Sequence, residues 1–148
     1  MISITEWQVG GIDDNIFKTS FNNVFNYEVN NSKNVVEAEY NAKIGLMYIT
    51  DYVYASPPED WNTTVFDYGY VDGSDPNNNW MYMGLYEWTI SRDFGSSSNQ
   101  AYLISKNGDL NSDGGVDQIF AIRPSFYLNS DVLYIGGTGS SSDPFRIQ

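Results

Sequence analysis

Apolar residues are most concentrated between Ile119 and Val132, in a run with one arginine, one proline and no acid before Asp131. The rest of the chain is crowded with acids, Asn and Ser, so this run predicts a buried strand followed by a short polar turn. Short strands at Val132–Ile135 and Asp143–Ile147 are expected to follow, separated by Gly and Ser. We therefore expect Ile119–Val132 to be the core strand of the fold.

Two short helices are predicted upstream. Apolar residues in Phe21–Val29 recur at i, i+3, i+4 and i+8 behind Ser20, a good N-cap, and this spacing lays them on one helical face. Lys43–Tyr48 is a compact apolar strand candidate. Thr50–Asp51 then offers an N-cap for a helix over Tyr52–Ala55, which ends at a serine and two prolines.

A meander of strands is expected in the second half. Trp80–Gly84 and Tyr86–Ser91 both alternate as strands, and Ala101–Ser105 returns after a polar, Gly-containing turn. In the second of these strands, alternation puts Glu87 and Thr89 on the face opposite the apolar side chains.

The segment Glu59–Asn79 has no clear periodicity and carries aromatic residues among Asp, Gly and Asn. A loop of about twenty residues inside a compact domain is uncommon and usually functional. The alternative is a covering loop whose aromatic rings pack onto the sheet. Some of these rings are expected to anchor the loop and others to face outward.

Length and charge narrow the function classes. The 148 residues predict one domain over 1–148, and 19 acidic against 7 basic residues give a net charge of −12. That charge opposes binding to nucleic acid and to anionic membranes. No apolar run approaches the roughly 20 residues that span a bilayer. The start of the chain lacks the features of a signal peptide. The chain is therefore either cytoplasmic or a domain excised from a longer exported protein, and we expect the second.

The absence of cysteine and histidine excludes further chemistry. Neither a thiol nucleophile, a Ser–His relay, nor a thiolate or imidazole metal site can be assembled. Tyr, Ser, Asn and Gly are abundant instead, and these residues build adaptable recognition surfaces. The same residues also fill the turns of an ordinary loop-rich β domain, and composition alone leaves both interpretations open.

Several phrases resemble a known family: AKIGLMYITDYVYAS (Ala42–Ser56), YEWTISR (Tyr86–Arg92), FAIRPSFYLNSDV (Phe120–Val132) and TGSSSDPFRI (Thr138–Ile147). In this order they resemble small surface domains of Gram-positive gut bacteria, often carried behind pilin-like or lipoprotein N-termini. Those domains look like members of the C-type-lectin-like superfold, related to formylglycine-generating sulfatase-activating domains and to phage tropism determinants.

The resemblance implies an α+β, C-type-lectin-like fold: a twisted antiparallel sheet, two short helices and a long loop region that presents a binding face. In some members that face is diversified by retroelements, and residues 93–118 are where this chain would vary. The catalytic cysteines of the sulfatase-activating relatives are absent here, so that activity is not implied.

One stretch opens like a calcium loop. Oxygen-bearing side chains stand at positions 1, 3, 5 and 9 of Asp109–Asp117, with Gly at position 6. Position 12 is Phe120 instead of a bidentate acid, and the stretch Asn107–Asp117 is also expected to be a turn between two strands. Calcium is therefore a possible cofactor, with a Gly/Asp/Asn turn as the alternative. The candidate ligands are Asp109, Asn111, Asp113 and Asp117.

Two arginines and several acids allow further interpretations. Arg92 and Arg123 stand in apolar strand contexts, where Arg is rarely buried unpaired, so ion pairs with Glu87, Asp93 or Asp131 are expected. Carboxylate pairs also permit a less favoured interpretation as a glycoside hydrolase. These pairs are Asp13/Asp14, Glu37/Glu39 and Asp72/Asp75.

The leading prediction is a non-enzymatic, adhesin-like domain at the cell surface or outside the cell. It would bind a protein or carbohydrate on another cell, or on a phage or host surface, without nucleic acid and without inserting into the membrane through this segment. The alternative is a self-associating pilus or surface-layer subunit. The expected ligand-binding residues are Trp61, Tyr68, Tyr70, Trp80, Asp93, Phe94, Asn99 and Tyr102.

Overall fold

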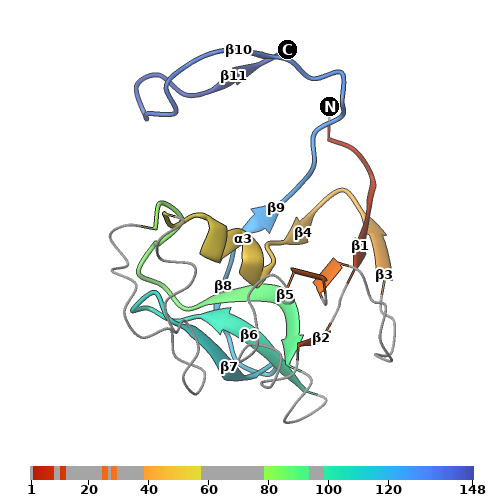
Figure 1. Cartoon of the computed structure of the whole chain (residues 1–148), viewed down its shortest axis with the longest axis vertical. Helices are drawn as coiled ribbons and strands as arrows, with labels where there is room; N and C mark the ends of the chain where they lie inside the picture. Colours follow the sequence, from red (N-terminus) through yellow and green to blue (C-terminus); the bar gives the residue numbers. More distant parts are fainter. Residues whose placement is uncertain are drawn as a thin grey trace.

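A computed structural model shows a body of short strands around one helix, from which the C-terminal segment projects as an arm (Figure 1). The architecture is β-rich and broadly α+β. The structure describes residues 2–8, 11–12, 25–26, 28–29, 39–57, 79–93 and 99–148.

The largest sheet has five strands, in the order β2 (Gly11–Ile12), β5 (Glu87–Asp93), β6 (Gln100–Ile104) and β7 (Leu110–Gly115), with β8 (Ala121–Ile122) also paired to β5. The β5–β6 and β6–β7 pairs are antiparallel, as the predicted meander requires. The short strands β2 and β8 run parallel to β5, so the sheet is mixed.

Two smaller sheets flank it. Strand β1 (Thr5–Gln8) pairs antiparallel with β3 (Glu39–Ala42), and β4 (Gly45–Leu46) pairs antiparallel with β9 (Pro124–Ser125). Buried Trp7 of β1 fits where Gly45 has no side chain, since a Cβ there would lie 2.5 Å from the indole ring. This close approach ties the two small sheets together and requires glycine at this position.

Helix α3 (Ile49–Tyr54) begins three residues before the predicted helix. The side chain of Asp51 accepts a hydrogen bond of 2.9 Å from the backbone N–H of Tyr48, which caps the first turn. Thr50–Asp51 thus lies inside the helix instead of before it. Residues 25–26 and 28–29 are also helical, within the first predicted helix. No helix in the described ranges is long and apolar enough to cross a membrane.

The hydrophobic core lies between α3 and the central sheet, and the prediction that Ile119–Val132 forms it is wrong. Within that run, Ile119 is 97 % and Ile122 65 % exposed, and its strands β8 and β9 have two residues each. Strand β8 pairs with β5 of the central sheet, and β9 pairs with β4. The buried apolar residues that the structure describes are Trp7, Met47, Tyr48, Ile49, Tyr52, Val53, Ala55, Tyr102, Leu103, Ile104 and Leu110.

Two further expectations about strands are corrected. Trp80–Gly84 forms turns instead of a strand: Tyr82 N–H donates to the Asn79 carbonyl at 3.0 Å, and Gly84 has a φ of +69°. Conversely, the predicted turn Asn107–Asp117 contains strand β7, which continues the central sheet beyond β6.

The polar face of β5 is the buried one. Glu87, Thr89, Ser91 and Asp93 are each at most 4 % exposed, whereas the side chains between them are only half-buried. Buried polar groups require hydrogen-bond partners. The Thr89 hydroxyl, for example, donates to the carbonyl of Tyr102 at 2.7 Å. The sheet therefore faces the core with hydrogen-bonded side chains as well as apolar ones.

Glu28 is the centre of this polar network. Its carboxyl group accepts hydrogen bonds from the backbone N–H groups of Ile49 (3.0 Å) and Thr50 (3.4 Å), and from the Thr50 hydroxyl (2.5 Å). The Ser91 hydroxyl of β5 also donates to it. Complete burial raises the pKa of Glu28 to about 7, although these four donors favour the charged form. One side chain thus joins a helical segment, the start of α3 and β5.

The predicted ion pair of Arg123 is confirmed. Its guanidinium binds Glu87 through two hydrogen bonds of 3.0 and 2.8 Å, and it also donates to the Met81 carbonyl at 2.6 Å. This forked geometry is the strongest form of an Arg–carboxylate pair. For Arg92 an ion pair stays a prediction.

The first testable prediction concerns Glu28. Burial raises the pKa of Glu28 from 4.5 to about 7. Between these two pH values the folded state keeps a proton that the unfolded chain has released. The free energy of unfolding therefore falls as the pH rises through this range. Glu28→Gln removes the titration. The free energy of unfolding of the variant, minus that of the wild type, should rise by roughly 3 kcal/mol from pH 4.5 to 7.5 in urea titrations. Glu6→Gln, at an exposed site, controls for the lost charge. A difference that stays constant with pH would contradict the prediction.

A second prediction concerns Arg123. Arg123→Met leaves the buried Glu87 carboxyl without its forked partner and should lower the free energy of unfolding by about 3 kcal/mol in chemical denaturation. Arg146→Met is the matched control because its pair with Asp143 is exposed on both sides, and its loss should change stability by less than about 1 kcal/mol. Equal losses in the two variants would show that the Glu87 pair has no special structural role.

Candidate functional site

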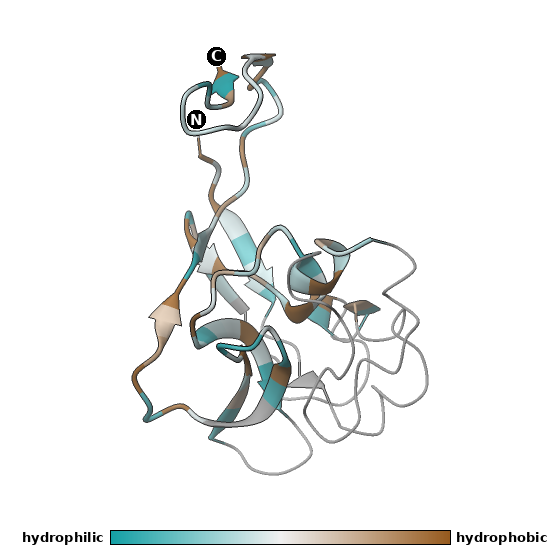
Figure 2. Ribbon diagram, turned by 90° about the vertical axis from the view of Figure 1, so that its left-hand side faces the viewer, coloured by the Kyte–Doolittle hydropathy of each residue, from teal (hydrophilic) through white to brown (hydrophobic). Residues whose placement is uncertain are grey.

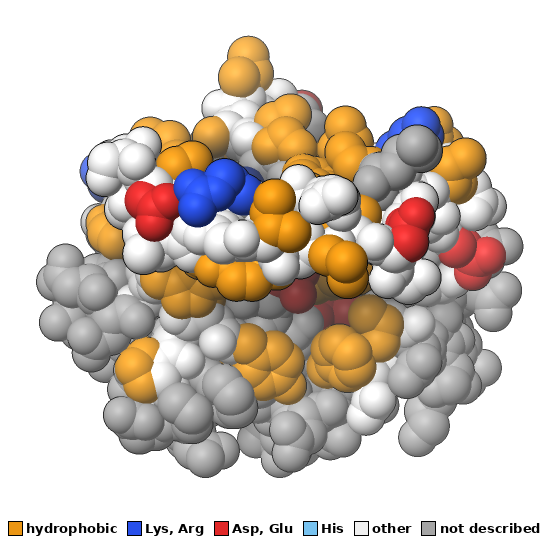
Figure 3. Space-filling view, turned by 90° about the horizontal axis from the view of Figure 1, so that it is seen from above, with side chains coloured by type: hydrophobic (Ala, Val, Ile, Leu, Met, Phe, Trp, Pro, Cys, Tyr) orange, Lys and Arg blue, Asp and Glu red, His pale blue; other side chains and the backbone are white. Residues whose placement is uncertain are grey.

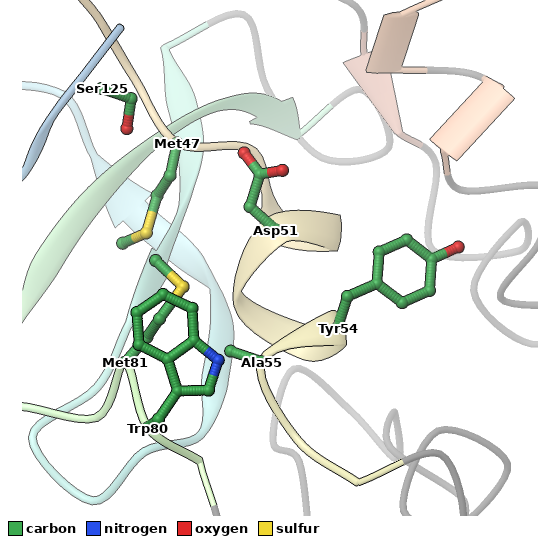
Figure 4. A pocket seen from close by; sticks show the side chains of 7 residues that line it. All are labelled: Met47, Asp51, Tyr54, Ala55, Trp80, Met81 and Ser125. Carbon is green, nitrogen blue, oxygen red and sulfur yellow. The ribbon is translucent and has the colours of Figure 1, made fainter. Parts of the chain in front are cut away.

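The candidate site is an open pocket of about 370 Å³ beside α3, within the size range of small-ligand sites (Figure 4). Residues from four separated stretches meet there: the segment before α3, the helix itself, the turn at Trp80, and β9. The lining residues are Met47, Asp51, Tyr54, Ala55, Trp80, Met81 and Ser125.

Asn79 holds one wall of the pocket in place. Its buried side-chain amide donates to the Tyr52 carbonyl (2.8 Å) and the Ser56 hydroxyl (3.1 Å), and its side-chain oxygen accepts from Met81 N–H (2.9 Å). The backbone N–H of Trp80 also donates to the Ala55 carbonyl, at 3.4 Å. These bonds fasten the turn to the C-terminal end of α3, and they do so through neutral groups.

The opposite wall is fixed by the central sheet. Ile90 N–H of β5 donates to the Met47 carbonyl at 3.0 Å, which places Met47 at the edge of the pocket. Figure 4 shows the thioether side chains of Met47 and Met81 pointing toward one another, with the Trp80 ring next to Met81. Thioethers are flexible and polarisable, so they form an adaptable apolar floor.

Trp80 is the most exposed tryptophan that the structure describes, at 81 %. Its neighbour Asn79 points inward and is 6 % exposed, so the indole ring is directed outward. An anchored backbone therefore presents a large aromatic surface to solvent. Tyr54, also partly exposed, extends from α3 away from the Trp80 ring (Figure 4).

Polar groups occupy another part of the pocket wall. Burial raises the pKa of the Asp51 carboxyl group, and the hydrogen bond from Tyr48 N–H opposes that effect. Part of Asp51 stays exposed to the pocket, and Ser125 adds a hydroxyl group from β9. The pocket thus combines an aromatic and thioether surface with a carboxyl and a hydroxyl group.

Of the eight predicted ligand-binding residues, Trp80 lines the pocket. Asn99 is exposed in the turn before β6 but does not line the pocket. Asp93 and Tyr102 are each 2 % exposed, because they lie on the inward faces of β5 and β6, so neither side chain is at the surface where binding was expected. The remaining four, Trp61, Tyr68, Tyr70 and Phe94, lie outside the described residues.

The candidate calcium ligands lie along a strand. Asn111 and Asp113 belong to β7, Asp109 precedes it, and Asp117 is in the exposed turn after it. A strand extends by about 3.3 Å per residue, so it spreads ligands that a calcium loop would wrap around the ion. The described residues contain no group of three or more acidic side chains placed to hold a metal. Calcium binding stays a prediction.

Sequence reasoning missed most of the pocket. Thr50–Asp51 was expected to precede the helix as its N-cap, whereas Asp51 lies inside the first turn and accepts a hydrogen bond from Tyr48 N–H. Nothing local indicated that Met47, Met81 and Ser125 would line a pocket with it. The strongest available signal was Asn79 before Trp80, a polar side chain next to a large ring after a loop. Only the structure shows that Asn79 is buried and that the Trp80 ring is exposed.

Comparisons with protein-family models, curated proteins and solved structures found no match to this chain.

Proposed function

We propose that the chain is a ligand-binding domain that recognises a carbohydrate or protein through the pocket beside α3. The observation that carries this proposal is the position of Trp80, which is 81 % exposed at an open pocket yet anchored through its backbone and through Asn79. Because its backbone is held in place while its ring is open to solvent, Trp80 is suited to contact a partner.

The chemistry of the lining supports such a ligand. The flat face of an indole packs against apolar C–H surfaces of sugars or side chains, and tryptophan is enriched among residues that dominate binding energy. The Asp51 carboxyl and the Ser125 hydroxyl offer an acceptor and a donor for ligand hydroxyl or amide groups. With a net charge of −12 on the chain, neutral or basic ligands are favoured over polyanions.

Binding is favoured over catalysis by the acid content of the pocket. Among the described residues that line it, Asp51 is the one carboxyl group. Glycoside hydrolysis generally uses two carboxyl groups on either side of the scissile bond. We therefore propose recognition without turnover, at the surface of an exporting cell, in keeping with the family that the sequence resembles.

Substitution of Trp80 tests the proposal. Ligands are first identified by applying the wild-type domain to arrays of bacterial and host glycans and of surface proteins, and affinities are then measured by calorimetry. Trp80→Ala should weaken binding about thirtyfold, the effect of losing one dominant aromatic contact of about 2 kcal/mol. Asp51→Asn and Ser125→Ala should weaken binding less.

Tyr40→Ala is the matched control, since Tyr40 is another exposed aromatic residue, 69 % exposed on β3, that does not line the pocket. The Tyr40→Ala variant should bind the ligand with the same affinity as the wild type. Unchanged binding in Trp80→Ala, or an equal loss in Tyr40→Ala, would refute the proposed site. Hydrolysis of a glycan by the wild type that Asp51→Asn abolishes would refute the non-enzymatic proposal.

A further inference from the structure

Residues 132–148 form a hairpin, here called the arm, that projects from the body (Figures 1 and 2). Strands β10 (Tyr134–Gly136) and β11 (Arg146–Ile147) pair antiparallel, and Leu133 and Gln148 exchange two backbone hydrogen bonds of 2.9 Å. Within the described part of the chain, no other strand pairs with this hairpin. An isolated two-stranded hairpin is at best marginally stable in water.

The arm exposes large apolar side chains on both faces. Tyr134 is opposite Ile147, and its ring meets Phe145 edge-on with centroids 5.9 Å apart, so these three residues share one face. The alternating positions Leu133 and Ile135 face the other way. Exposure is 64 % for Leu133, 64 % for Tyr134, 55 % for Ile135, 67 % for Phe145 and 52 % for Ile147.

One apolar face of the arm supplies about half of the area that a dimer interface requires. At these exposures the three side chains of the face shared by Tyr134, Phe145 and Ile147 present on the order of 400 Å² of mostly apolar area, within the size range of the largest patch on a typical monomer. A stable interface buries about 800 Å² per partner. A second arm, with its neighbouring turn residues, supplies a surface of matching size and kind.

The distribution of charge favours a contact through the arm over a contact through the body. The arm contains Asp143 and Arg146, which form an ion pair at 2.8 Å, so its charges cancel and the whole net charge of −12 lies outside it. Two bodies brought together repel each other, whereas two arms that project away from the bodies do not. Figure 3, which looks onto the molecule from above, shows many hydrophobic and few charged side chains on this side.

We propose that the arm is a homodimerisation element that packs against the arm of a second copy, with the Tyr134, Phe145 and Ile147 faces in contact. A two-fold arrangement supplies the covering layer that each hairpin lacks and keeps the acidic bodies apart. The proposal is independent of ligand binding in the pocket beside α3, since it involves none of the pocket residues.

An anionic membrane fits the arm less well. Arg146 is its one basic residue and is already paired with Asp143, while the whole chain is strongly acidic. A different protein with an apolar surface is the remaining alternative, and the experiment separates it from a second copy.

The test is sedimentation velocity of the full chain from about 1 to 500 µM, at low and high salt. The wild type should pass from monomer to dimer over this range, and salt should strengthen the dimer because it screens repulsion between the bodies. Ile147→Lys should raise the dissociation constant at least about tenfold, because it places a charge in the apolar contact. Ile119→Lys is the matched control: the same substitution at a site 97 % exposed on the body should leave the constant unchanged.

Three results would overturn the proposal. A wild type that stays monomeric throughout the range would exclude a second copy as the occupant and leave a different protein as the candidate. Equal weakening by Ile147→Lys and Ile119→Lys would place the contact outside the arm. A dimer that dissociates as salt rises would be held by ion pairs instead of by the apolar face.

Discussion

The structure depends on one buried carboxyl group. Glu28 receives hydrogen bonds from the start of α3 and from Ser91 of β5, so it links a helical segment near the beginning of the chain to both partners of the core. A charged group in such a place is unfavourable unless it is well hydrogen-bonded. Four donors reduce that penalty without removing it, as the raised pKa shows. This polar contact acts together with apolar packing to fix α3 on the sheet, and with it the core residues Tyr52, Tyr102 and Leu110.

The pocket follows from the same arrangement. Once α3 is fixed at its beginning by Glu28, its other end offers the carbonyl of Tyr52 and the Ser56 hydroxyl to Asn79. These hydrogen bonds hold the turn that carries Trp80 against the C-terminal end of α3. The Arg123–Glu87 pair adds a second link, because Arg123 also donates to the Met81 carbonyl on the same turn. The site is thus built at the junction of helix, sheet and turn, and no single segment contains it.

Sequence patterns predicted what depends on neighbours along the chain. The helix at α3, the β5–β6 hairpin and the Arg123–Glu87 pair were all indicated by local spacing or by a charge in an apolar context. The cap was not, because Thr50–Asp51 lies inside the observed helix. Alternation in β5 correctly grouped Glu87 with Thr89, but it cannot say which face turns inward, since register depends on the covering layer.

The same limit explains the error at Ile119–Val132. Its apolar content was clear from the sequence, yet burial also requires an element to pack on it, and that depends on the tertiary arrangement. Glu28 shows the converse. Glu28 lies within the helix that was predicted from the apolar residues of Phe21–Val29. Nothing in the local sequence indicates that an acid there would bind the start of another helix.

Asn79 has a consequence for how a ligand would be received. Its three hydrogen bonds involve only neutral groups, and all of them form when the chain folds. The loss of freedom needed to hold the Trp80 backbone has therefore already occurred before any encounter. A ligand meets a backbone in its final place and need only settle the indole side chain, so the affinity of this surface is set by the fit of the contact rather than by the ordering of a loop.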